Sequence, residues 1–165
     1  MRVSGLASSL YWERDDAISA LAAQWPAVKL EPDAKRVVWA LRDGFRDTRP
    51  GPVSELVAFA ARSTGEIREA AVNALASIHS REALPFLAGL LQSSDDWERM
   101  RGVFGLSSFA NGCVPQRVED SKTLRFLQFG PSPYRTKDTE ANFGRGVPEG
   151  VAFWQSWWNS HPELH

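Results

Sequence analysis

The side chains best suited to catalysis, histidine and cysteine, are few and widely spaced in this 165-residue chain. The histidines are His79, His161 and His165, and the one cysteine is Cys113. Acid–base or nucleophilic catalysis needs such groups within hydrogen-bond reach of one another, and no histidine can be assigned to Cys113 from the sequence. We interpret His79 as a helix-end residue and Cys113 as an unreactive thiol.

The acidic and glycine-rich stretches have structural explanations. Asp95-Asp96 and Glu119-Asp120 each precede a segment that an acidic residue could cap. Gly144-Arg145-Gly146 is too short for a phosphate loop, and no predicted strand precedes it. No group of His, Cys, Asp and Glu has metal-ligand spacing. The sequence therefore predicts a protein that is not an enzyme, with no metal and no cofactor.

One basic pattern stands out against a net charge of only −1. Arg42, Arg46 and Arg49 fall on one face of a predicted helix. They form either a solvated face with ion pairs one turn apart or a basic patch for an acidic partner or a phosphate backbone. The overall charge indicates no nucleic-acid partner. Without a signal peptide or a long apolar stretch, we expect a cytoplasmic chain with no membrane contact.

The elements that carry these residues come from an internal repeat. Val53–Ile78 aligns without a gap on Leu84–Phe109 at an offset of 31 residues. Apolar residues fall on apolar ones, small on small, and Arg68 on Arg99. Apolar positions recur at helical spacing in each half of each copy. We therefore predict two helical hairpins, at 52–79 and 81–110.

Helix starts and close contacts can also be located. Ser63 with Glu66 has capping-box spacing, and Ser80 and Asp95 are expected N-caps. The small residues Ala71 and Ala74 of the first copy become Gly102 and Gly105 in the second. Since glycine destabilises a helix interior by about 1 kcal/mol, we interpret the pair as permitting a close helix approach. The alternative is a flexible, poorly formed helix.

Two stretches resemble a known family. Residues 83–91 read Ala-Leu-Pro-Phe-Leu-Ala-Gly-Leu-Leu, and residues 67–75 read Ile-Arg-Glu-Ala-Ala-Val-Asn-Ala-Leu. Both resemble the two helices of the HEAT repeat and of its PBS-lyase-like bacterial variants. The second copy departs from the pattern, with glycines at the small positions. The resemblance covers 52–110 and implies an all-α fold, a right-handed α-α superhelix of about three hairpins.

The remaining segments complete a single domain, residues 1–165. We expect a degenerate first hairpin at 15–47 and an irregular segment at 111–147, which is either flexible or laid across the repeats. At 148–160 we expect a Trp-rich helix, similar to the closing helix of some bacterial HEAT-repeat proteins.

That last helix needs a docking surface. Two polar positions of the first copy become Met100 and Phe104 in the second. We expect the C-terminal segment, through Trp154, Trp157 and Trp158, to cap the last hairpin over these two residues. The rival interpretation is an exposed apolar patch that binds a partner.

The resemblance implies a non-catalytic protein–protein interaction module or scaffold with an unidentified protein partner. Expected partner-binding residues are Arg42, Arg46, Arg49, Arg68, Asn73 and Arg99. The alternatives are a nucleic-acid-binding or DNA-glycosylase-like protein, and a PBS-lyase-like bilin attachment factor. A further alternative is an accessory domain of a longer solenoid.

Overall fold

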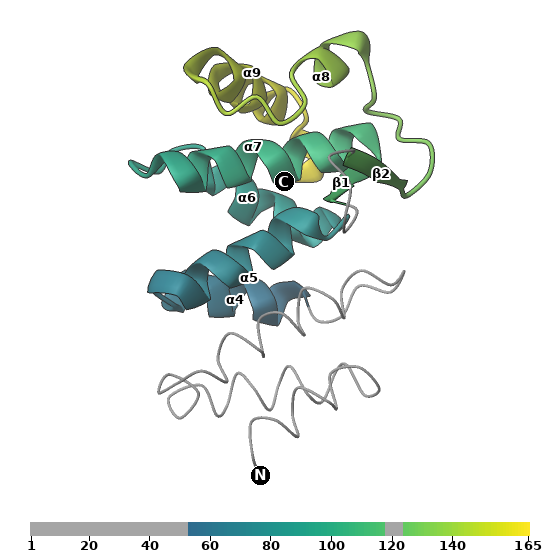
Figure 1. Ribbon diagram of the computed structural model, residues 1–165. Helices are drawn as coiled ribbons and strands as arrows, with labels where there is room; N and C mark the ends of the chain where they lie inside the picture. The colour runs from purple at the N-terminus through teal and green to yellow at the C-terminus, as the bar shows by residue number, and fades with distance from the viewer. Residues whose placement is uncertain (1–52, 118–123) are drawn as a thin grey trace. The chain divides into compact units, whose positions relative to one another are not determined.

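A computed structural model describes residues 53–117 and 124–165 (Figure 1). These residues form six α-helices, in agreement with the predicted helical fold. They also form a two-stranded hairpin, which the prediction did not include. The chain divides after Ile78 into two compact units, each described by itself below. The predicted hairpin at 15–47 lies outside the described residues.

The described part of the first unit is one helical hairpin, α4 (Val53–Arg62) and α5 (Gly65–Ser77). One stripe of α4 is buried against α5, and Val53, Leu56 and Ala60 are almost wholly inaccessible. This is the stripe that the helical spacing predicted. The small residues of α5, with Val72 and Leu75, complete this side of the core.

The turn between α4 and α5 is closed by side chains that bond back to α4. The Ser63 hydroxyl donates to the Phe59 carbonyl at 2.7 Å, and the Arg68 guanidinium donates to the Ala60 carbonyl at 2.7 Å. The Phe59 carbonyl also accepts the Ser63 backbone N–H at 3.1 Å, and the Arg68 bond reaches one of the last carbonyls of α4, which a helix end leaves without partners in the next turn. The predicted capping box at Ser63 is wrong, because the N-cap is Thr64, whose side chain makes no capping bond.

The second unit opens with the second hairpin. A 3₁₀ turn, Arg81–Ala83, leads into α6 (Leu84–Leu90), and α7 (Asp96–Asn111) follows. Ser80 caps the 3₁₀ turn and Asp95 caps α7, each accepting a backbone N–H with its side-chain oxygen. Both predicted N-caps are confirmed.

An arginine closes this second turn as well. The Arg99 guanidinium donates to the Ser93 carbonyl at 2.6 Å, just beyond the end of α6. Arg68 and Arg99, which coincide at the 31-residue offset, thus bond to the chain at the end of the preceding helix in both hairpins. The repeated arginine therefore marks a repeated turn closure.

The glycines of α7 allow α6 to approach closely. A Cβ atom added at Gly102 would lie 2.7 Å from the Leu87 carbonyl oxygen, and one at Gly105 would lie 2.6 Å from Leu87 Cδ1. Real Cβ atoms do not approach other atoms so closely. The close approach predicted from the two glycines is confirmed, and the poorly formed helix is not observed.

The other side of α7 receives the C-terminal part of the chain. After the short helix α8 (Lys137–Ala141), α9 (Pro148–Asn159) packs along α7, and a final 3₁₀ turn, Pro162–Leu164, packs on α9 (Figure 1). Trp154 is wholly buried, and its indole N–H donates to the Asn142 carbonyl at 2.9 Å. The buried core here comprises Leu84, Ala88, Leu91, Val103, Leu106, Ala110, Val151, Trp154, Trp157 and Leu164.

Part of the expected irregular segment 111–147 is regular, so that prediction needs correction. Strands β1 (Cys113–Arg117) and β2 (Leu124–Gln128) pair antiparallel. Gly112, at φ +65°, ends α7 in the left-handed conformation and turns the chain into β1. The glycines and prolines there read as loop signals, and five-residue strands give little periodic signal.

A buried polar contact ties α7 to α8. The Asn111 side-chain amide donates to the Ser107 and Thr139 carbonyls at 2.9 and 3.1 Å. The Thr139 hydroxyl also lies 3.2 Å from the Asn111 side-chain oxygen. Both residues are buried, so the contact fixes the position of α8 by directional bonds rather than by apolar area.

The close approach of α6 and α7 predicts opposite effects for two glycine-to-alanine substitutions. Gly102→Ala should destabilise the protein by about 1–3 kcal/mol, because the new methyl group meets a backbone oxygen. Gly89→Ala, in α6 with open space around it, should stabilise by up to about 1 kcal/mol. Urea unfolding of both variants would measure this; stabilisation by both would contradict the close contact.

The burial of Trp154 predicts a large loss on truncation. Trp154→Ala should lower the free energy of unfolding by about 3–5 kcal/mol, since it removes a core ring and a hydrogen bond. The half-buried Trp158 is the matched control, and Trp158→Ala should lower it by clearly less. Equal losses in thermal denaturation would show that α9 is not anchored through Trp154.

Candidate groove between α7 and α9

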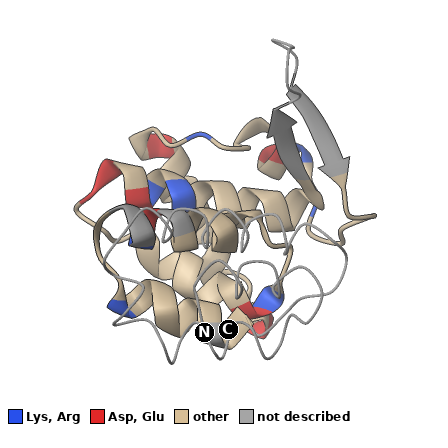
Figure 2. Cartoon of the chain, turned by 60° about the horizontal axis from the view of Figure 1, so that its bottom comes forward, with Lys and Arg blue, Asp and Glu red and all other residues tan. Residues whose placement is uncertain are grey.

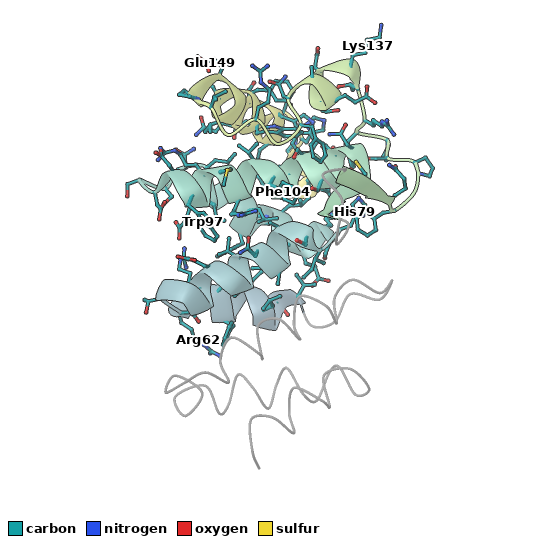
Figure 3. The ribbon with its side chains drawn as sticks, in the orientation of Figure 1. Arg62, His79, Trp97, Phe104, Lys137 and Glu149 are labelled. Atoms are coloured by element: carbon teal, nitrogen blue, oxygen red, sulfur yellow. The ribbon has the colours of Figure 1, made fainter. Side chains whose placement is uncertain are left out.

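An open groove of about 770 Å³ lies between the N-terminal half of α7 and the start of α9. Its walls come from two helices, on which Figure 3 labels Trp97 (α7) and Glu149 (α9). The segment that leads into α9 supplies the rim. The lining residues are Leu91, Asp96, Trp97, Arg99, Met100, Gly146, Val147, Pro148, Val151, Ala152 and Gln155.

Exposed apolar side chains concentrate at this groove. Among the described residues, the large hydrophobic side chains that stay exposed are Met100 (39%), Phe129 (39%) and Val147 (47%). Two of these three line the groove. Met100 also lies close to the residue before Val147, because a Cβ added at Gly146 would lie 3.0 Å from Met100 Cγ. The groove therefore carries two exposed apolar side chains beside its polar ones.

The charged side chains of the groove and its glutamine are engaged within the protein. Arg99 forms an ion pair with Asp96, three residues earlier on α7, and also holds the Ser93 carbonyl. The Gln155 side chain donates to the Leu91 carbonyl at 3.1 Å. The charges of Arg99 and Asp96 offset one another, so the groove offers little net charge to a ligand.

Charge over the described residues forms no dominant patch. Figure 2 shows basic and acidic residues interspersed on the helices, with most of the ribbon carrying neither. A second ion pair among the described residues, Arg135 with Glu140 at 2.6 Å, joins two exposed side chains. Such pairs contribute about 0–1 kcal/mol and do not create a field for a charged ligand.

The residues predicted to bind a partner fall into two groups. Arg42, Arg46 and Arg49 lie outside the described residues. Asn73 is half-buried on α5, and its backbone carbonyl accepts the Ser77 hydroxyl at 2.8 Å. Arg68 and Arg99 belong to different units. Each guanidinium donates a hydrogen bond to a carbonyl near the end of the preceding helix, so each also has a structural role. Of the three predicted partner-binding residues that the structure describes, Arg99 lines the groove.

The residues predicted to dock the C-terminal cap are divided between two contacts. Trp154 and Trp157 lie in the core with α7, and Trp158 is half-buried. Met100 and Phe104 contact the segment before α9 instead. Phe104 meets Phe143 edge-on, with ring centroids 6.3 Å apart, and Met100 lies against Gly146.

Sequence reasoning missed the rim of the groove. Val147 belongs to a segment without helical periodicity, so no pattern marked it as exposed or buried. Its one local signal is the following proline, Pro148, which starts α9. That signal locates the helix but not the exposed valine before it.

The histidines lie in an aromatic network rather than in a catalytic group. His79 stacks between Phe109 and Phe129, with ring centroids 4.9 and 4.8 Å away. Its Nε2 lies 3.2 Å from the Phe109 carbonyl, which can only accept, so Nε2 carries the hydrogen. Burial lowers the pKa of the His79 imidazole below its usual value, because the charged form loses hydration.

The network continues from Phe109 to the end of the chain. The ring centroids of Phe109 and Tyr134 are 5.8 Å apart, and those of Tyr134 and Trp157 are 6.0 Å apart. Trp157 then stacks on His161, with ring centroids 4.4 Å apart. His161 Nδ1 also lies 2.6 Å from the Trp157 carbonyl. This histidine thus helps to close α9.

In the described part of the chain the thiol is buried, and the carboxylates join no metal-binding group. Cys113 is buried, and the loss of hydration raises the pKa of its thiol, which disfavours the nucleophilic thiolate. Across residues 53–117 and 124–165, no three His, Cys, Asp or Glu side chains gather to hold a metal. No helix in the same ranges is long and apolar enough to cross a bilayer.

Comparison with known proteins finds a family whose pattern part of the chain matches. Residues 31–107 match the family of HEAT repeats, which is a little under half of the chain. The match includes α4, α5 and α6 and most of α7, and it ends before the β-hairpin, α8 and α9. No curated protein and no solved structure matches the chain. The groove therefore lies between a matched helix, α7, and an unmatched one, α9.

The environment of His79 predicts a pH dependence of stability. Because the pKa of His79 is lower in the folded state than its usual value of 6.5, the unfolded chain binds the proton more readily. Stability should be full above pH 6.5, fall as the pH drops below it, and level off below the folded-state pKa.

His79→Gln isolates this contribution, because the amide can still donate to the Phe109 carbonyl but does not titrate near neutrality. Urea midpoints between pH 7.5 and 5 should fall less for the variant than for the natural chain. Parallel curves would show that His79 does not contribute to the pH dependence.

Proposed function

We propose that this chain is a non-catalytic, protein-binding HEAT-repeat module that holds an apolar segment of a partner protein in the groove between α7 and α9. The observation that carries the proposal is the pairing of Met100 and Val147, both exposed and both at one groove. Proteins with HEAT repeats often bind other proteins, and the matched region includes the α7 wall.

The character of the lining favours a segment with few charges. Trp97, Met100 and Val151 offer aromatic and aliphatic contact, and methionine adapts to different side-chain shapes. The Arg99–Asp96 pair leaves little charge to neutralise a ligand. An inserted aromatic side chain is the expected anchor, since aromatic residues are enriched among the few that carry most of the binding energy of an interface.

The six polar residues predicted to contact a partner remain part of this proposal. Arg99 would lie beside the bound segment, and Arg68 and Asn73 belong to the other unit. Arg42, Arg46 and Arg49 would provide a separate basic face. The alternatives, nucleic-acid binding and bilin attachment, have no residue in the groove that favours them, because its arginine is already paired with Asp96.

A peptide selection would test the proposed groove. Random peptides displayed on phage would be selected on the natural chain, and their affinities measured by fluorescence anisotropy. Val147→Asp should weaken the selected apolar peptides about ten-fold or more, because it places a charge at the contact. Arg81→Glu, an exposed change away from the groove, is the matched control and should leave affinity unchanged.

Two results would contradict the proposal. Selected peptides that bind the Val147→Asp variant as tightly as the natural chain would place the binding surface elsewhere. A selection that returns only acidic peptides, with binding lost in the Arg42/Arg46/Arg49 triple alanine variant, would favour the basic face instead.

A further inference from the structure

The register of the β-hairpin determines which backbone groups face outward. Cys113 lies opposite Gln128. The next residues, Gly112 and Phe129, are joined by a hydrogen bond in which the Phe129 N–H donates to the Gly112 carbonyl at 2.8 Å. Hydrogen-bonded and non-hydrogen-bonded pairs alternate along an antiparallel ladder. Cys113 and Gln128 therefore form a non-hydrogen-bonded pair, and so does every second pair beyond them.

The residues of these non-hydrogen-bonded pairs direct their N–H and C=O groups to the outer edges of the hairpin. On β1 the outward positions are Cys113, Pro115 and Arg117. Proline has no N–H, so the outer edge of β1 is interrupted at its centre. On β2 the outward positions are Leu124, Phe126 and Gln128, and each carries both a donor and an acceptor.

The two edges thus differ in their capacity to pair. Proline at an outward position is one way in which proteins protect an edge strand, and only β1 has it. Two strands alone are marginally stable in water. Among the described residues no third strand joins this sheet, which lies at the C-terminal end of α7 (Figure 1). In the part of the chain that the structure describes, the uninterrupted edge of β2 thus has no strand paired with it.

We propose that β2 pairs antiparallel with β2 of a second copy of this chain, about a two-fold axis at Phe126. Phe126 then lies opposite its own copy, and Leu124 lies opposite Gln128 of the second copy. These are the outward positions, so each donor meets an acceptor along the whole strand. Arg125 falls opposite Leu127 of the second copy, so no like-charged positions face one another.

The same geometry explains why assembly stops at two chains. The four-stranded sheet has β1 at both outer edges, and each of those edges is interrupted by Pro115. A two-fold interface of this kind uses the same surface on both chains and leaves no second β2 edge for a third. The inference uses different residues from the proposed groove, so either can fail without the other.

Proline substitution at the centre of β2 tests the interface. Phe126→Pro removes one outward N–H, and it breaks no bond within the hairpin because the Pro115–Phe126 pair is non-hydrogen-bonded. Phe126→Ala is the matched control, since it changes the side chain and keeps the N–H. Light scattering should give twice the chain mass for the natural protein and the control at high concentration, and the single-chain mass for Phe126→Pro.

Amide hydrogen exchange on the natural chain gives a second measurement that does not depend on a variant folding. The N–H groups of Phe126 and Gln128 should exchange about ten-fold more slowly at high than at low concentration. Those of Arg125 and Leu127, which face β1, should not change with concentration. A chain that stays monomeric, a Phe126→Pro variant that still dimerises, or concentration-dependent protection confined to α7 or α9 would each overturn the proposal.

Discussion

The second unit depends on how closely α7 can be approached from two sides. Gly102 and Gly105 let α6 come so near that a single methyl group would collide with Leu87. Val103 and Leu106 of the same helix belong to the buried core that also contains Trp154 of α9. Because a packed interior has few voids, neither helix can be displaced without opening the core around α7.

Much of this arrangement could be predicted because repeats and helices leave periodic signals. The 31-residue offset aligned Arg68 with Arg99, and it located the helices and the small positions where they meet. The physical role of those arginines could not be predicted. In the sequence, an arginine that closes a turn looks the same as one that binds a partner. Only the bonds to the Ala60 and Ser93 carbonyls show that these two arginines close turns.

The β-hairpin and the groove could not be predicted from the sequence, for different reasons. Pairing between Cys113–Arg117 and Leu124–Gln128 depends on register. The sequence of two short strands, one of them with a proline, does not predict that register. The groove depends on where the segment before α9 crosses α7, and Val147 carries no periodic signal of that path. The family match also ends before either feature begins.

The aromatic network that runs from His79 to His161 has a consequence for how this unit folds. Repeat arrays held by neighbour contacts alone can gain and lose structure one repeat at a time. Here, rings from the beginning and the end of the unit contact one another through Phe109, Tyr134 and Trp157. Contacts so distant in sequence raise the contact order and slow folding, so we expect the unit to unfold in one cooperative transition rather than repeat by repeat.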